Sequence, residues 1–205
     1  MIADRRRFLA LASTATGVAA IGVPAFAEEF AERAMGDVVL GDASAPVTVI
    51  EYASLTCPHC AAFHEDTFPV IKANYIDTGK VNFIMREVYF DRYGLWASML
   101  ARCGGERGFY PMSEMFLKQQ RSWTRSDDIA GAIRKIGRVN GLGSDQIDAC
   151  LNDEPYARAL VERYQAFAEE DGVRSTPSFV INGELKSGNM GVSEFSAWLD
   201  EALSS

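Results

Sequence analysis

Two short apolar stretches in the first half of the chain lack the spacing of a helix. Val47–Ala53 and Val81–Val88 are rich in β-branched and apolar residues, which predicts buried strands. Between them, apolar side chains recur at helical spacing from Phe63 to Tyr75, so a helix is predicted there, with a kink at Pro69. The predicted order is therefore strand, helix, strand.

The middle of the chain, residues 94–153, has the spacing of successive helices. Four helices are predicted there: around Leu95–Leu100, over Tyr110–Gln120, from an N-cap at Ser126, and from Ser144. A long helix is predicted to follow at about residues 153–170, because Pro155 is well tolerated in a first helical turn.

The last part of the chain returns to strands. Ser178–Leu185 contains Asn182-Gly183 between two apolar stretches, a pattern typical of a tight hairpin, and Phe195–Leu203 has helical spacing. With a short strand at Asp37–Gly41, the pattern predicts an α/β fold, in which a sheet lies between two helical layers and a helical domain is inserted into the core. The predicted parts are 28–93 (first part of the sheet domain), 94–153 (helical insertion) and 154–205 (second part of the sheet domain).

The first 27 residues have the organisation of a secretion signal. A basic start contains Arg5-Arg6-Arg7-Phe8-Leu9, a stretch of small and apolar residues follows, and Ala25-Phe26-Ala27 has the small-x-small pattern of a cleavage site. We expect cleavage after Ala27 and export to the periplasm. The arginine pattern resembles a twin-arginine signal, although the general secretory route and a retained N-terminal anchor stay open.

Composition restricts the function further. The chain has 205 residues, 48% of them hydrophobic and 23% charged, which is typical of a globular domain. Its net charge is −8 and it has no basic stripe, so we expect no binding to nucleic acid. The four cysteines are an even number, and export would allow them to form disulfides.

The chemistry is concentrated in Cys57-Pro58-His59-Cys60, which directly follows a predicted strand. Pro58 suits the first turn of a helix, which would place Cys57 at the helix N-terminus, where backbone N–H groups stabilise a thiolate. The pKa of Cys57 is therefore expected to fall into the range of roughly 3.5–7.5. His59 could donate a hydrogen bond or a charge to that thiolate, and Cys60 is expected to be the more buried, resolving thiol.

Two other interpretations of the motif stay open. Two cysteines at this spacing also form half of a zinc site, for which His59, His64, Cys103 and Cys150 would be the further candidates. A purely structural disulfide is the other interpretation, although so short a loop contributes little stability. We expect neither a metal nor a cofactor, and we expect His64 to be an exposed helix residue.

Cys-Pro-His-Cys after a strand, with Thr176-Pro177 far downstream, resembles the DsbA family of periplasmic thiol oxidases. Glu51 stands six residues before Cys57, like a buried acid of that family, and the segment from Gly172 to Gly183 is similar to the family's cis-proline loop and following strand. The resemblance covers nearly all of residues 37–203 and implies a thioredoxin-like fold with a helical insertion.

The resemblance also implies roles for residues outside the motif. The Thr176–Pro177 bond would be cis, would pack against the active-site disulfide and would bind extended substrate segments. Glu51 would tune the proton balance near Cys60. The family's basic partner of this acid has no clear match, and Lys80 and Arg86 are the nearby candidates.

Cys103 and Cys150 both lie in the helical part of the chain. We expect them to form a structural disulfide, worth roughly 4 kcal/mol in the chain-entropy model. The alternative is a pair of buried free thiols.

The resulting hypothesis is a monomeric, exported oxidase that introduces disulfides into unfolded or newly exported proteins with free thiols. The family implies a membrane-bound reoxidant of the DsbB type. A disulfide isomerase or reductase on the same fold is the nearest alternative, and a non-catalytic thioredoxin-like chaperone is the alternative from another class.

Overall fold

The computed structural model describes residues 36–205. Their five strands form one sheet in the order β1-β3-β2-β4-β5. Its centre is the seven-residue strand β2, which is parallel to β3 and antiparallel to β4. The strands are β1 (Val39–Leu40), β2 (Val47–Ala53), β3 (Val81–Glu87), β4 (Ser178–Ile181) and β5 (Glu184–Ser187).

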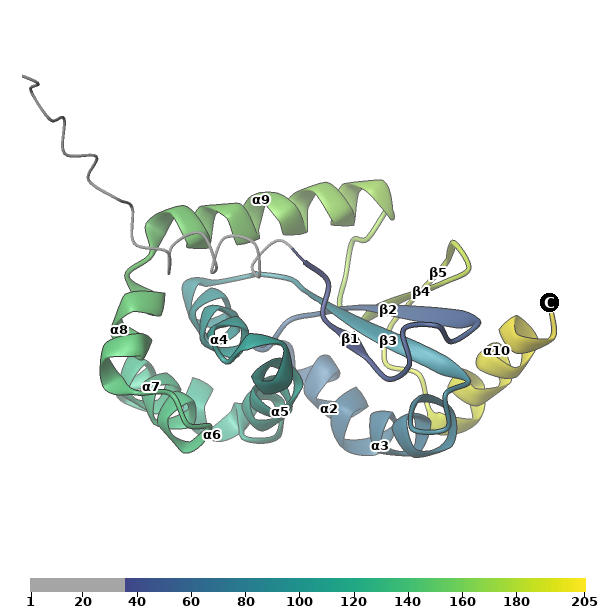
Figure 1. Cartoon of the computed structure of the whole chain (residues 1–205), viewed down its shortest axis with the longest axis horizontal. Helices are drawn as coiled ribbons and strands as arrows, with labels where there is room; N and C mark the ends of the chain where they lie inside the picture. Colours follow the sequence, from purple (N-terminus) through teal and green to yellow (C-terminus); the bar gives the residue numbers. More distant parts are fainter. Residues whose placement is uncertain (1–35) are drawn as a thin grey trace, which may run out of the picture.

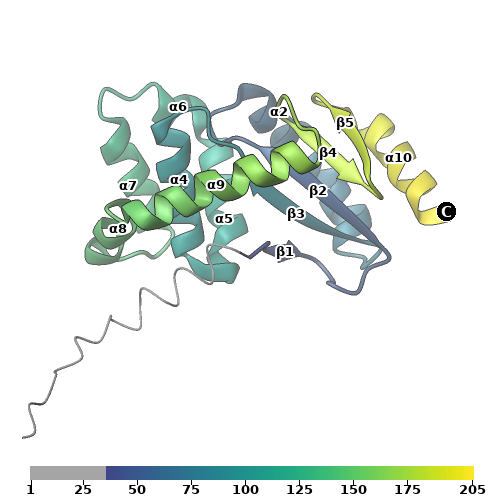
Figure 2. The same ribbon diagram turned by 90° about the horizontal axis from the view of Figure 1, so that it is seen from above.

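Helices cover both faces of this sheet. In Figure 1, α9 crosses one face, α2, α3 and α10 lie on the other, and α4 to α8 gather at one end. The view from above in Figure 2 shows α9 lying over the central strands. The helices are α2 (Pro58–Asp66), α3 (Phe68–Ile71), the π-helical turn η1 (Lys72–Ile76), α4 (Arg92–Cys103), α5 (Gly105–Lys118), α6 (Gln120–Thr124), α7 (Ile129–Val139), α8 (Ser144–Leu151), α9 (Glu154–Glu170) and α10 (Val192–Ser204).

This arrangement confirms the predicted α/β class and the helical insertion, which follows β3 and precedes β4. The predicted secretion signal at residues 1–27 lies outside the described residues. Within residues 36–205, none of the helices has both the length and the apolar character that crossing a membrane requires.

Two apolar layers hold the helices to the sheet. On the side of α2 and α10, the buried rings of Phe63, Phe179 and Phe195 pack together, with centroids 4.6 Å apart for Phe63–Phe179 and 4.9 Å apart for Phe179–Phe195. On the side of α9, a smaller cluster includes Tyr52 and Ala168. The central strand β2 is therefore buried on both faces, which explains why apolar residues occupy both of its faces.

Some predicted helix boundaries were wrong. The helix expected from Phe63 to Tyr75 breaks at Thr67, which places Pro69 in the first turn of α3, where its missing N–H is tolerated. The N-cap of α7 is Asp128 rather than Ser126, because the Asp128 carboxylate accepts the N–H of Gly131 at 2.8 Å.

Further contacts join the insertion and α9 to the sheet domain. Arg102 on α4 donates two hydrogen bonds of 2.6 Å to the buried carboxylate of Glu87 on β3. Asp37, which precedes β1, pairs with Arg86 on β3 at 3.0 Å and with Arg163 on α9. Because both partners in the Arg102–Glu87 pair are almost fully buried, removing one would leave an uncompensated charge.

Replacing Phe195 with alanine tests the aromatic layer. Phe195 is fully buried against the rings of Phe63, Phe179 and Trp198, so Phe195→Ala is expected to lower the free energy of unfolding by about 3–5 kcal/mol. Chemical denaturation of the oxidised protein measures this loss. Phe90→Ala is the control, because Phe90 is 61% exposed and its truncation is expected to change the value by no more than about 0.5 kcal/mol. Equal losses of unfolding free energy in the two variants would contradict the stabilising role of the aromatic layer.

Candidate active site

The Cys57–Cys60 motif sits where β2 passes into α2. Cys57 is the N-cap residue of α2, with extended backbone angles, and Pro58 occupies the first turn. The N–H of Cys57 donates to the carbonyl of Ser54 at 3.0 Å, which closes a tight turn after the strand. This local structure follows from the sequence, because an apolar strand followed by a proline favours a helix start at that point.

The two sulfurs lie in opposite environments. Cys57 is 8% exposed and Cys60 is fully buried, and both are free thiols in this structure. A hydrogen bond from Cys60 lowers the pKa of Cys57 to about 5, with further help from the backbone N–H groups of Cys60 and His59, while burial acts in the opposite direction. The pKa of Cys60 is raised by its hydrogen bond to Cys57, by burial and by the nearby Glu51 carboxylate.

The loop before β4 reaches the same point. The Thr176–Pro177 peptide bond is cis, as the resemblance implies, and the Cys57 thiol donates to the Thr176 carbonyl at 3.4 Å. The pairing of β2 with β4, which sets Tyr52 opposite Ser178, brings the two segments together.

His59 is an exposed residue of the first turn of α2, and its backbone N–H helps to lower the pKa of Cys57.

The partner of Glu51 is His64, which was wrongly predicted to be an exposed helix residue. Glu51 is fully buried in β2, and its Oε2 lies 2.8 Å from Nε2 of His64. The His64 side chain is only 5% exposed, which contradicts the expected exposed position. His64 follows Cys60 by four residues, so the two side chains share one face of α2, and this spacing was the signal available in the sequence.

Neither basic residue proposed as the partner of Glu51 has that role. Arg86 binds Asp37 and Asp171, and Lys80 lies over the ring of Tyr75 at 5.4 Å from the ring centroid. Neighbouring strand residues alternate between the faces of a sheet, and Arg86 is directed to the face covered by α9, where it also stacks on Phe167.

Gln120 also supports the site, although no pattern in the sequence predicts this role. This buried side chain at the start of α6 donates to the carbonyl of Leu55 at 2.9 Å and to the carbonyl of Cys57 at 3.0 Å. The insertion therefore holds the turn that presents Cys57. No local signal marks such a residue, because its partners lie more than sixty positions away in the sequence.

Cys103 on α4 and Cys150 on α8 form a disulfide, as expected, so they brace two helices of the insertion. This pairing also removes the two thiols that a zinc site with Cys57 and Cys60 would have needed. Within residues 36–205, no group of three or more His, Cys, Asp or Glu side chains is arranged to hold a metal ion.

Comparisons with known proteins agree with this geometry. A family model described as thioredoxin matches residues 33–201. The crystal structure of Wolbachia pipientis alpha-DsbA1 is similar with a TM-score of 0.76 at 30% identity, over 82% of this chain and 92% of that one. The chain belongs to the DsbA-like thioredoxin family.

Curated relatives of this DsbA-like chain carry related names. A Rickettsia bellii protein named as a protein-disulfide oxidoreductase is 34% identical over 82% of this chain. Disulfide bond formation protein D of Bacillus subtilis is 27% identical over 73% of the chain and 69% of its own length. The chain spans only 64% of the length of the Rickettsia bellii relative.

The low pKa of Cys57 predicts a titration that can be measured directly. In the reduced protein, the ultraviolet absorbance of the thiolate is expected to appear at about pH 5 and to be lost in Cys57→Ser. A transition close to the ordinary thiol value of 9.0 would contradict this prediction.

The same pKa predicts how stability depends on pH. A folded-state pKa below the unfolded value stabilises the reduced fold, fully above pH 9 and progressively less as the pH falls toward about 5. The oxidised protein lacks this thiol. The free energy of unfolding of the reduced protein, relative to the oxidised protein, is therefore expected to rise between pH 5 and 9.

Gln120→Leu removes both side-chain hydrogen bonds to the turn before α2. It leaves the carbonyls of Leu55 and Cys57 without these donors, so we expect a loss of about 1–3 kcal/mol in the free energy of unfolding. Gln119→Leu is the matched control, because Gln119 is exposed. Denaturant unfolding of both variants makes the comparison, and a loss of similar size in the control would refute the proposed role of Gln120.

Proposed function

We propose that the protein is an exported thiol–disulfide oxidoreductase that introduces disulfides into other proteins through Cys57 and Cys60. The observation that carries the proposal is the contrast between the two sulfurs: Cys57 has a pKa of about 5 at a helix N-terminus, and Cys60 is buried beneath it. A low-pKa sulfur is a good leaving group and stabilises the reduced enzyme, so such a disulfide is strongly oxidising.

The reaction starts from the Cys57–Cys60 disulfide. A substrate thiolate attacks the Cys57 sulfur, the disulfide bond breaks, and Cys60 leaves as a thiolate that takes up a proton. A second substrate thiolate then attacks the substrate sulfur of the mixed disulfide, and Cys57 leaves as a thiolate. The substrate dithiol is thereby oxidised to a disulfide, and the enzyme is reduced by the same two electrons.

The loop with the cis peptide bond is the proposed substrate-binding element. Thr176 and Pro177 border Cys57, and the backbone of Thr176 would pair with an extended segment of an unfolded protein. While Cys57 is protonated, its thiol donates to the Thr176 carbonyl. Backbone pairing depends little on side-chain identity, so it gives low sequence specificity. The substrates would therefore be newly exported proteins with free thiols rather than one specific partner.

The proposed cellular setting follows from the N-terminal sequence and the family. Residues 1–27 would direct export and be removed after Ala27, leaving a monomeric periplasmic enzyme. A DsbB-type membrane protein would reoxidise the Cys57–Cys60 pair. The family names of the relatives support disulfide chemistry, and the export signal rests on the sequence pattern alone.

Equilibration of the mature chain, residues 28–205, with glutathione buffers tests the direction of the chemistry. A potential near roughly −120 mV is expected for an oxidase, whereas one near roughly −270 mV would indicate a reductase and overturn the proposal. Alkylation and mass measurement count the titrating thiols at the same time: two are expected, since Cys103 and Cys150 are already paired.

Cys57→Ser separates an oxidase from a chaperone. The variant is expected to lose all oxidation of a reduced, unfolded substrate protein, because the attacked sulfur is absent. Serine at Cys103 and Cys150 together is the control, since that pair lies in the insertion and takes no part in the proposed exchange. Full oxidase activity in Cys57→Ser would exclude the proposed mechanism.

A further inference from the structure

The contact between the loop at residues 172–177 and the Cys57 sulfur cannot persist through the proposed reaction. The Cys57 thiol donates to the Thr176 carbonyl at 3.4 Å while it holds its proton. Neither a thiolate nor a disulfide sulfur has a hydrogen to donate, so both forms of Cys57 that take part in the exchange lack this bond. In those forms, the position of the loop depends on other contacts.

The first end of this loop is fixed by Asp171, the C-cap residue of α9. Its carboxylate accepts a hydrogen bond from the hydroxyl of Tyr52 on β2 and another from Arg86 on β3 at 3.2 Å. Arg86 also donates to the Tyr52 hydroxyl at 2.9 Å, so the three side chains form a closed triangle. Burial and the bond to Asp171 raise the pKa of Tyr52 above its ordinary value, so the hydroxyl keeps its proton and acts as the donor.

Tyr52 joins this triangle to the strand that carries the reactive sulfur. It is fully buried in the apolar cluster on the α9 side of the sheet, and Cys57 follows it by five residues. Val173, two residues after Asp171, packs into the same cluster, and its N–H donates to the Ala168 carbonyl on α9 at 2.8 Å. Tyr52 therefore connects the strand that leads to the motif with the start of the proposed substrate-binding loop.

The other end of the loop is fixed by the β4–β5 hairpin. Ser178, the first residue of β4, donates to the Ser175 carbonyl at 2.7 Å, and the Pro177 carbonyl accepts the N–H of Gly188 at 2.8 Å. The loop is thus anchored on both sides, and its middle keeps its place beside the motif only while both ends hold.

We propose that Tyr52 and Asp171 are positioning residues, which hold the substrate-binding loop beside Cys57 in the forms that react. The inference rests on the proposed oxidoreductase function. An extended substrate segment would pair with the backbone of Thr176, so its cysteine reaches Cys57 only if the loop stays aligned with the strand that leads to the motif. A small thiol has no peptide backbone to pair. The anchor therefore matters for protein substrates and not for small thiols.

Tyr52→Phe is the main test, because it removes the hydroxyl and keeps the buried ring. Reduction of the oxidised protein is timed with an unfolded peptide that carries two cysteines and with dithiothreitol, by acid quench, alkylation and mass spectrometry. The peptide rate is expected to fall roughly tenfold or more, whereas the dithiothreitol rate and the equilibrium constant against glutathione are expected to stay within about twofold of the parent values. An equal fall in both rates would mean that Tyr52 acts on the sulfur itself, and two unchanged rates would mean that the loop needs no such anchor. Either result overturns the proposal.

Tyr75→Phe is the matched control, because it deletes a hydroxyl of the same kind in a different part of the fold. The Tyr75 hydroxyl in η1 donates to the carboxylate of Asp200 on α10 at 2.9 Å. Both rates of this variant are expected to equal those of the parent protein. A selective loss of the peptide rate in Tyr75→Phe would show that the effect is not specific to the Tyr52 anchor, and would refute the proposal.

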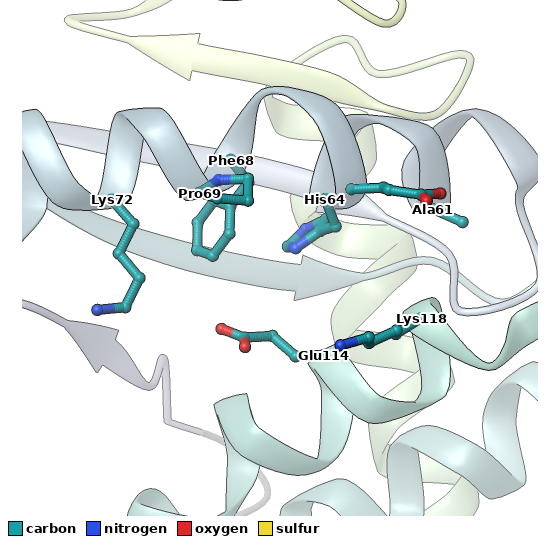
Figure 3. Close-up of a pocket in the computed structure, with 8 residues that line it drawn as sticks. Ala61, His64, Phe68, Pro69, Lys72, Glu114 and Lys118 are labelled. Atoms are coloured by element: carbon teal, nitrogen blue, oxygen red, sulfur yellow. The ribbon is translucent and has the colours of Figure 1, made fainter.

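A pocket beside α2 is the alternative location for the substrate segment. It has a volume of about 340 Å³, and Glu114 and Lys118 on α5 lie opposite His64 across it (Figure 3). This pocket is on the α2 side of the sheet, whereas Tyr52 lies in the cluster on the α9 side. Lys118→Gln is therefore expected to leave the peptide rate unchanged. A selective loss of the peptide rate in Lys118→Gln, with a normal rate in Tyr52→Phe, would place the substrate in the pocket and overturn the proposal.

Substitutions at Asp171 cover the case in which Tyr52→Phe disturbs the fold. Asp171→Asn keeps an oxygen that can accept from Tyr52, whereas Asp171→Ala removes the acceptor. The peptide rate is expected to be retained in Asp171→Asn and to fall in Asp171→Ala as it does in Tyr52→Phe, with the dithiothreitol rate unchanged in both. Equal peptide rates in these two variants would exclude the hydrogen bond as the anchor. Failure of the proposed function itself is distinguishable, because the parent protein would then not oxidise the peptide, although dithiothreitol would still reduce its disulfide.

Discussion

The contact between the Cys57 sulfur and the Thr176 carbonyl is the constraint around which the structure is organised. These two residues are separated by 119 positions, yet their atoms lie 3.4 Å apart. Pairing of β2 with β4 brings the segments together, and the cis Thr176–Pro177 bond lies directly before β4. The helical insertion lies between these two halves of the site in sequence, so it has to leave and rejoin the sheet without disturbing their register.

The second organising feature is the asymmetry between the two sulfurs of one short motif. The hydrogen bond from Cys60, aided by backbone N–H groups at the helix end, favours negative charge on Cys57, while the same hydrogen bond, burial and the Glu51 carboxylate oppose it on Cys60. One sulfur is therefore prepared to leave as a thiolate and the other to hold a proton. Both effects arise from position: the two cysteines are three residues apart, but one caps the helix and the other faces the sheet.

The insertion also takes part in the site instead of only covering it. Gln120 holds the carbonyls of the turn that presents Cys57, and Arg102 ties α4 to Glu87 on β3. The Cys103–Cys150 disulfide braces α4 against α8 within the same unit. A packed helical block of this kind limits the movement of α2, so the thiolate stays aligned with the loop that would bind substrate.

The sequence by itself determined the features that depend on local periodicity and helix-end chemistry: strand β2, the helix start at Pro58, the hairpin at Asn182-Gly183 and the reactive motif. The resemblance to the DsbA family predicted that the Thr176–Pro177 bond is cis. Only the tertiary structure decided that His64 is the partner of Glu51, that Gln120 supports the turn, and that Arg86 is directed away to Asp37 and Asp171. The physical reason is that backbone periodicity is set by neighbours along the chain, whereas a buried polar side chain finds its partner by position in space.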